Sequence, residues 1–123
     1  MINPDLIMKE ESIDSVKDSI RKWYNQDKHH YVTVNAIDNG ETLTLDWIFS
    51  EYETKNKIYV FRVENVGYNT QIPTMTDFLS CAWVSEWDLA DMFDLNIENA
   101  HRGMFLQPDA PKAPLRKESY SGK

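Results

Sequence analysis

Cysteine is almost missing from this sequence, which has only Cys81 among its 123 residues. A single thiol excludes an internal disulfide. It also excludes an iron–sulfur cluster held by this chain alone, because such clusters need about four thiolate ligands. Glycine is scarce as well, and neither of the glycine-rich phosphate-binding motifs occurs. We therefore expect no nucleotide site of either kind.

Long hydrophobic runs are absent too, since no stretch approaches the roughly 18 apolar residues of a membrane-spanning helix. The first residues, Met1-Ile2-Asn3-Pro4-Asp5, lack the basic and apolar regions of a signal peptide. Positive charge is sparse in residues 1–100, where 18 acidic side chains face 8 basic ones, whereas residues 101–123 have 5 basic and 2 acidic ones. The excess of negative charge in residues 1–100, which we call the body, repels nucleic acid and anionic membranes. We expect a cytosolic protein that reaches a membrane only through other subunits.

What is present is a pattern typical of a small α+β domain. Apolar residues at helical spacing predict a helix over about residues 12–25, with Ser12 as its N-cap. Runs rich in β-branched and aromatic residues predict an antiparallel meander of three strands, with a tight turn at Asn39-Gly40 between the first two. These runs cover residues 31–37, 42–52 and 58–66. Residues 1–11 fit either a short extended piece or the beginning of the helix.

A second short helix is predicted after the sheet. Ser85 followed by Asp88 resembles a capping box, and Val84 and Leu89 occupy the positions of a hydrophobic staple. The helix should end near Phe93.

The last part of the chain is predicted to be a tail. Prolines prevent regular structure there, and the segment is too poor in apolar residues to fold on itself, so it is disordered or lies on a partner. The expected organisation is one α+β domain over residues 1–106, with the N-terminal helix packed on the sheet, and an extended tail over residues 107–123.

Residues that could carry chemistry do not form a recognised motif. The possible metal ligands lack ligand spacing, and nothing around Cys81 marks a catalytic nucleophile, so a buried apolar role is its simpler interpretation. Four clustered carboxylates could supply an acid and a base, and Trp83 and Trp87 form one stripe that suits a core or an interface. The pattern favours an interaction or structural subunit over an enzyme. The ligand candidates are His29, His30, Cys81 and His101, and the carboxylates are Glu86, Asp88, Asp91 and Asp94.

The second half of the chain resembles a known family, the 30 kDa (C) subunit of respiratory NADH:quinone oxidoreductase. The order and spacing agree over about residues 72–117. The preceding strands, with Ala36-Ile37-Asp38 after the first, are similar in layout, so the resemblance covers most of the chain from about residue 12 and is strongest in the second half. Three departures stand out: Trp87 replaces an arginine, Asp94 replaces a glycine, and Arg102-Gly103 replaces an arginine pair. The matching residues are Ile72-Pro73-Thr74-Met75-Thr76-Asp77-Phe78-Leu79, Ala82-Trp83, Glu86, Asp91-Met92-Phe93, His101, Arg102 and Pro114-Leu115-Arg116-Lys117.

Members from complex I are usually longer at the N-terminus, whereas the related subunits of energy-converting membrane-bound [NiFe] hydrogenases are short. In length, the chain is therefore most similar to the C-like (D) subunit of such a hydrogenase. The resemblance implies a cofactor-free subunit on the cytoplasmic side of the membrane, in the peripheral arm. Its neighbours would be the large subunit, related to the 49 kDa or [NiFe]-bearing subunit, and the small iron–sulfur subunit, with membrane subunits in the same complex. Such a complex passes electrons from reduced ferredoxin to protons and couples this reaction to ion translocation.

The resemblance also implies where partners bind. The candidate interface residues are Pro73, Thr74, Thr76, Asp77, Trp83, Glu86, Trp87, Asp91, His101, Arg102, Pro114, Leu115, Arg116 and Lys117. Three alternatives stay open: a C subunit of true complex I or of a coenzyme-linked relative, a small free-standing enzyme, and an assembly factor that leaves the mature complex.

Overall fold

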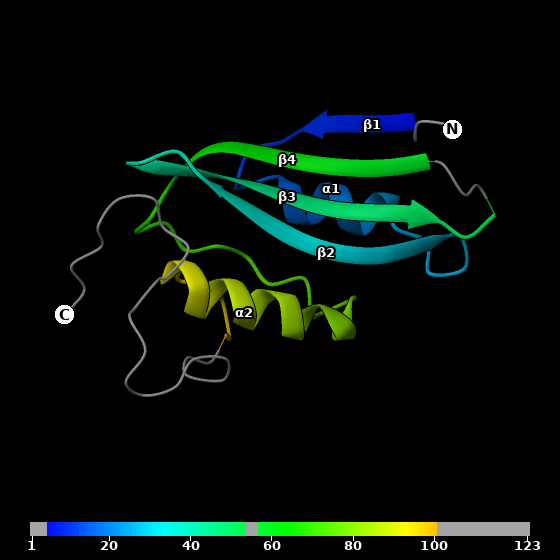
Figure 1. Cartoon of the computed structure of the whole chain (residues 1–123). Coiled ribbons are helices and arrows are strands. Elements are labelled where there is room, and N and C mark those ends of the chain that lie inside the picture. The colour runs from blue at the N-terminus through cyan, green and yellow to red at the C-terminus, as the bar shows by residue number, and fades with distance from the viewer. Residues whose placement is uncertain (1–4, 54–56, 101–123) are drawn as a thin grey trace.

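The structure is a computed structural model that describes residues 5–53 and 57–100. It is an α+β fold in which one mixed sheet is covered on one face by two helices (Figure 1). The strands lie in the order β1-β4-β3-β2. Their bounds are β1 (Asp5–Glu10), β2 (His29–Asp38), β3 (Thr42–Glu51) and β4 (Lys57–Gly67).

The predicted three-stranded meander is confirmed. β3 pairs antiparallel with both β2 and β4, and the β2–β3 connection contains Gly40 at a φ of 101°, a left-handed conformation that suits glycine. Alternate residues of β3 point into the core, where Leu43, Leu45 and Phe49 are fully buried and Trp47 is almost so. On the opposite face, Arg62 donates two hydrogen bonds of 2.8 Å to the Asp46 carboxylate across the β3–β4 pair.

A fourth strand, β1, is a feature that the expectation of about three strands missed. It lies parallel to β4 at the edge of the sheet, with Ile7 opposite Tyr59. The segment Leu6-Ile7-Met8 is apolar without alternation, and therefore it has no period of two that would distinguish a strand. The pairing partner is about 50 residues away in the sequence, so only the tertiary structure selects the extended form.

The first helix is shorter than predicted. α1 (Val16–Trp23) begins after a turn at residues 13–15, so Ser12 is not its N-cap. The residue in the N-cap position is Ser15, whose hydroxyl donates to the Glu11 carboxylate at 2.8 Å and accepts no helix N–H. Tyr24 adopts an extended backbone and ends the helix.

The second helix also begins earlier than the capping-box pattern suggests. A 3-10 turn, η1 (Ser80–Ala82), leads directly into α2 (Trp83–Phe93), which places Ser85 inside the helix. Its hydroxyl donates to the Ala82 carbonyl at 3.1 Å and bonds the Tyr31 hydroxyl at 2.6 Å, so it is used for packing rather than for capping. The predicted end at Phe93 is confirmed.

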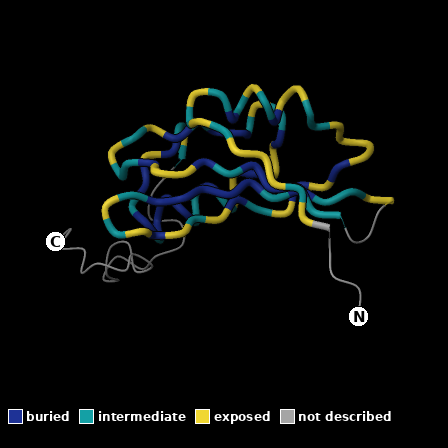
Figure 2. Tube along the Cα trace, turned by 90° about the horizontal axis from the view of Figure 1, so that it is seen from above, coloured by how far each residue is buried: buried dark blue, intermediate teal, exposed yellow. Residues whose placement is uncertain are grey.

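A single hydrophobic core lies between the sheet and the helices. Figure 2 shows that buried segments run along the central strands, while exposed segments lie at the turns and along the edge strand β1. Val16 and Ile20 of α1 and Leu89 and Phe93 of α2 pack on the same sheet face, near the fully buried Met75. The connection after β4 thus belongs to the core and is held in place by it.

Candidate partner interface

The connection between β4 and α2 passes through the segment 72–77, which holds four of the candidate interface residues. Ile72 forms a parallel bridge with Ile97, and its backbone makes two hydrogen bonds, from its N–H to the Asn96 carbonyl (2.8 Å) and from the Glu98 N–H to its carbonyl (2.9 Å). The segment is therefore fixed at one end by the chain that follows α2.

Glu86 of α2 fixes the middle of this segment. Its side chain is 3% exposed, and its carboxylate accepts a hydrogen bond from the Thr74 hydroxyl at 2.6 Å and another from the Met75 N–H at 2.8 Å. The Thr74 oxygen in turn accepts from the Thr76 N–H at 3.2 Å. Burial raises the pKa of Glu86, while these two hydrogen bonds oppose that rise. A buried carboxylate whose two oxygens each accept a hydrogen bond from the segment holds it in one defined conformation.

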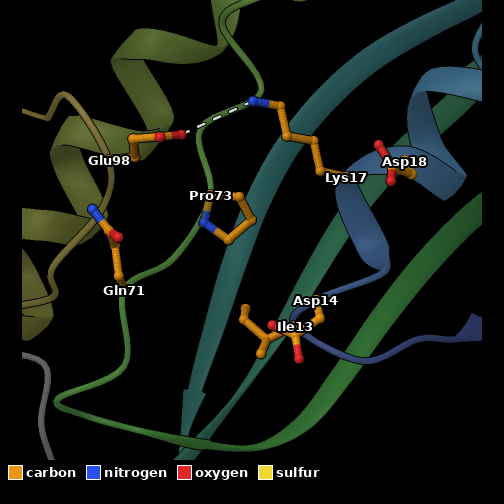
Figure 3. A pocket seen from close by; sticks show the side chains of 7 residues that line it. All are labelled: Ile13, Asp14, Lys17, Asp18, Gln71, Pro73 and Glu98. Carbon is orange, nitrogen blue, oxygen red and sulfur yellow. Dashed lines mark ion pairs between the residues drawn. The ribbon is translucent and has the colours of Figure 1, made fainter.

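Ion pairs attach the same segment to α1. Lys17 Nζ lies 2.7 Å from Asp77 Oδ2 and 3.9 Å from Glu98 Oε1, and Arg21 lies 3.3 Å from Asp77. Lys17, Pro73 and Glu98 line a polar pocket of about 280 Å³. Figure 3 shows the Lys17 side chain directed toward Glu98 across it. Lys17 and Arg21 lower the pKa of the exposed Asp77. Segment 72–77 thus joins both helices into one surface.

The aromatic stripe on α2 faces outward. The Trp83 and Trp87 rings contact each other edge to face, with centroids 5.0 Å apart, and Trp83 is exposed. A tryptophan pair on a helix, with Trp83 exposed and Trp87 half-buried, suits a protein interface, where tryptophan is enriched. Of the two roles open for this stripe, burial in the chain's own core does not apply to Trp83.

The candidate interface residues separate into accessible and buried groups. Pro73, Thr76, Asp77, Trp83 and Trp87 are accessible to a partner. Thr74, Glu86 and Asp91 are buried within the chain, and of these Thr74 and Glu86 act on any interface by fixing the backbone of segment 72–77. The remaining six lie outside the described residues: His101, Arg102, Pro114, Leu115, Arg116 and Lys117.

Sequence reasoning missed the basic side of this surface. Lys17 and Arg21 stand on the polar face of a helix and looked like solvated charges, yet both meet an aspartate about 60 residues away. No local pattern signals such a pair. The spacing of basic residues along a helix does not indicate which acidic residue of the folded chain they will meet.

The other candidates for chemistry do not come together. Cys81 is exposed, which contradicts the expectation of a buried apolar role. His29 is buried at the beginning of β2 and stacks on Trp23, whereas the adjacent His30 is exposed. Within residues 5–53 and 57–100, no group of three histidine, cysteine or acidic side chains is arranged to hold a metal ion. In that same part of the chain, no helix is long and apolar enough to cross a membrane.

Comparison with solved structures places this architecture in a known class of fold. The chain is similar to a chain in the structure of an archaeal respiratory membrane complex, the membrane-bound sulfane sulfur reductase (MBS), with a TM-score of 0.71. The two share 17% sequence identity, and the match covers 94% of this chain and 70% of the other. At that identity the likeness shows the fold. No curated protein sequence matches the chain.

Sequence comparison then identifies the family. The profile of the respiratory-chain NADH dehydrogenase 30 Kd subunit matches residues 6–123. The chain therefore belongs to the 30 kDa subunit family of respiratory NADH dehydrogenase. The resemblance expected from about residue 12, and strongest over residues 72–117, is confirmed, and the match also extends into β1.

Proposed function

We propose that this chain is a structural subunit of the peripheral arm of a complex I-related membrane complex, where it supports the large catalytic subunit. The family match over residues 6–123 is the observation that carries this proposal. The fixed segment 72–77 and the outward-facing Trp83–Trp87 pair support it, because they supply a rigid, partly aromatic surface.

The particular complex we propose is an energy-converting [NiFe] hydrogenase. In this assignment the subunit binds no cofactor, and the nickel–iron site and the iron–sulfur clusters belong to the large and small partner subunits. Membrane subunits of the complex would hold it on the cytoplasmic face. The complex would exchange electrons between ferredoxin and protons and couple that exchange to ion translocation.

Two other assignments within the same class have specific support. The family is defined by the NADH dehydrogenase subunit, which favours complex I or a coenzyme-linked relative. The fold match is to a chain of a sulfane sulfur reductase complex, which favours a relative of that complex. In all three, this chain would have the same structural role beside a different catalytic subunit.

The experiment that tests the proposal is purification of the tagged chain from detergent-solubilised native membranes, with identification of bound subunits and metal analysis. A large subunit containing nickel and iron, with iron–sulfur and membrane subunits, is the result we expect. The same set without nickel would move the assignment to complex I or to the sulfur-reducing relative, which quinone and sulfane sulfur reduction assays distinguish. A chain that purifies alone would overturn the proposal and return the small-enzyme and assembly-factor alternatives. Absence of the chain from the mature complex is the result expected of an assembly factor, whereas the variants Cys81→Ala and Asp91→Asn test the small enzyme.

A further inference from the structure

A groove lies between the β2 edge of the sheet and the beginning of α2. Its volume is about 670 Å³. On one side it is lined by β2 and on the other by η1 and α2, and it does not include segment 72–77. The lining residues that carry the argument are Tyr31, Val32, Val84, Ser85 and Asp88.

The floor of the groove is rigid. The buried Tyr31 donates to or accepts from Ser85 at 2.6 Å, which ties β2 to α2, and its ring packs edge to face on Phe49. A surface that is already ordered costs little conformational entropy when it binds a partner.

Two apolar side chains that line the groove from its two sides are exposed. Val32 on β2 is 49% exposed and Val84 on α2 is 45% exposed. The register of β2 against β3 shifts between Tyr31 and Thr33, and Val32 is the extra residue that this bulge leaves without a partner in β3. Contiguous apolar side chains around a groove mark a binding surface.

The groove is also charged with one sign. Asp88 is half-buried on its wall, and no basic side chain pairs with it among the described residues. Burial and the neighbouring Asp91 raise the pKa of Asp88, which is the effect of a carboxylate that lacks a cation. A partner with a lysine or arginine at this point would supply it. A second copy of this chain is disfavoured, because residues 1–100 have ten more acidic than basic residues.

The edge of the sheet suits an extended partner. β2 is the last strand of the sheet, and no described strand pairs with its outer side. An extended segment of another chain can add to such an edge by backbone hydrogen bonds and place alternate side chains in a neighbouring groove.

We propose that the β2–α2 groove is the docking site for an extended segment of a partner subunit, one that inserts aliphatic side chains between Val32 and Val84 and places a lysine or arginine against Asp88. The inference rests on the proposed function, and it deepens that function by assigning the partner's contact to a face outside the segment 72–77.

Site-specific photo-crosslinking in the assembled complex tests this docking site. The full-length tagged chain with Val84→p-benzoylphenylalanine should crosslink, after purification from membranes and irradiation, to one extended partner peptide that contains aliphatic and basic residues. The matched control is Leu6→p-benzoylphenylalanine on the open face of the sheet, where the side chain is 58% exposed. It should not crosslink to that peptide. A Val84 crosslink to residues 101–123 of the same chain, to a second copy, or to nothing in an assembled complex overturns the inference.

Charge and shape variants give a second readout. Val84→Glu should reduce the amount of this chain in the purified complex at least tenfold, whereas Leu6→Glu should change it less than twofold. Val84→Glu is compatible with folding, because an acidic residue in the first turn of a helix is favourable. Asp88→Lys should reduce assembly, and replacing the crosslinked partner's basic residue with glutamate should restore it. Equal losses for Val84→Glu and Leu6→Glu would overturn the docking site. A chain that joins no membrane complex overturns the proposed function itself.

Discussion

Glu86 shows how one buried carboxylate can determine the shape of a surface that it does not itself reach. It accepts hydrogen bonds from Thr74 and from the Met75 backbone, so it fixes the segment that carries Pro73 and Asp77. Glu86, which the family resemblance offered as a contact residue, therefore acts on a partner through its neighbours.

Glu86→Gln tests this role. Glutamine replaces one acceptor oxygen with a donor NH2 and removes the negative charge. Either the Met75 N–H then loses its acceptor, or the Thr74 hydroxyl must turn its proton to Thr76 and give up its bond to a carboxylate. We expect a loss of about 1–3 kcal/mol in the free energy of unfolding, measured by urea denaturation. The matched control Glu64→Gln, at an exposed position of β4, should change stability by less than about 0.5 kcal/mol. Equal stability of the two variants would contradict the role given to Glu86.

His29 provides a second test at the residue scale, because its surroundings favour the neutral ring. Its Nδ1 accepts a hydrogen bond from the Asn25 N–H, with 3.0 Å between the two nitrogens. Its ring stacks on the Trp23 ring, with the centroids 3.9 Å apart, and burial lowers the pKa of His29 below the usual 6.5. The unfolded chain then binds a proton at His29 before the folded chain does. Stability should therefore be complete above pH 6.5 and fall as the pH is lowered towards the folded-state pKa.

The measurement for His29 is an NMR titration of its imidazole resonances, together with urea denaturation at several pH values. We expect a midpoint below 6.5 for His29 and a smaller free energy of unfolding at pH 5.5 than at pH 7. A His29 midpoint at or above 6.5 would show that the Asn25 hydrogen bond and the stacking do not favour the neutral ring.

At the scale of elements, the end of α2 shows how the chain accommodates a departure from its family. Asp94 occupies the C-cap with a φ of 55°, and its N–H bonds the Ala90 carbonyl. This left-handed conformation is the one that glycine adopts most easily, and the family has glycine there. The departure is tolerated because aspartate enters this conformation more readily than most residues with a side chain.

A pair of substitutions isolates this backbone effect. Asp94→Gly and Asp94→Ala both remove the aspartate side chain and its contacts, so only the backbone preference separates them. We expect Asp94→Gly to be more stable than Asp94→Ala by roughly 1 kcal/mol, because a Cβ atom is strained in this conformation. Thermal unfolding followed by circular dichroism measures the difference. Equal stabilities would mean that α2 ends differently in solution.

At the scale of the whole molecule, the uneven charge distribution separates the body from the segment after it. Residues 1–100 have a charge balance of −10 and residues 101–123 one of +3. The hydrophobic core that holds the sheet to both helices lies within the described residues before position 101. We therefore expect that truncation separates folding of the body from attachment to a partner.

Deletion of residues 107–123 tests this separation. We expect the shortened chain to unfold cooperatively with nearly the same midpoint as the full chain, because no described core residue is removed. We also expect it to be recovered in smaller amounts with the membrane complex, since the basic and proline-containing segment is proposed to lie on a partner. Differential scanning calorimetry and quantitative recovery measure the two effects. Loss of cooperative unfolding would assign the segment to the folded domain.

The sequence alone determined those features that depend on local pattern. Alternation along residues 42–52 and the turn at Asn39-Gly40 predicted the meander, because period and turn chemistry are local properties. Phe93 ended the second helix as expected. The order and spacing of the motifs over residues 72–117 were enough to indicate the family, because they are properties of the linear chain.

The tertiary structure decided whatever depends on residues far apart in the chain. β1 is a strand because the edge of β4 is available to it, and Ser85 lies inside α2, where Tyr31 bonds it from β2. Glu86 is buried, Lys17 meets Asp77, and the β2–α2 groove forms only once the chain has folded. Each of these depends on a partner far away in the sequence, and a local pattern contains no information about such a partner.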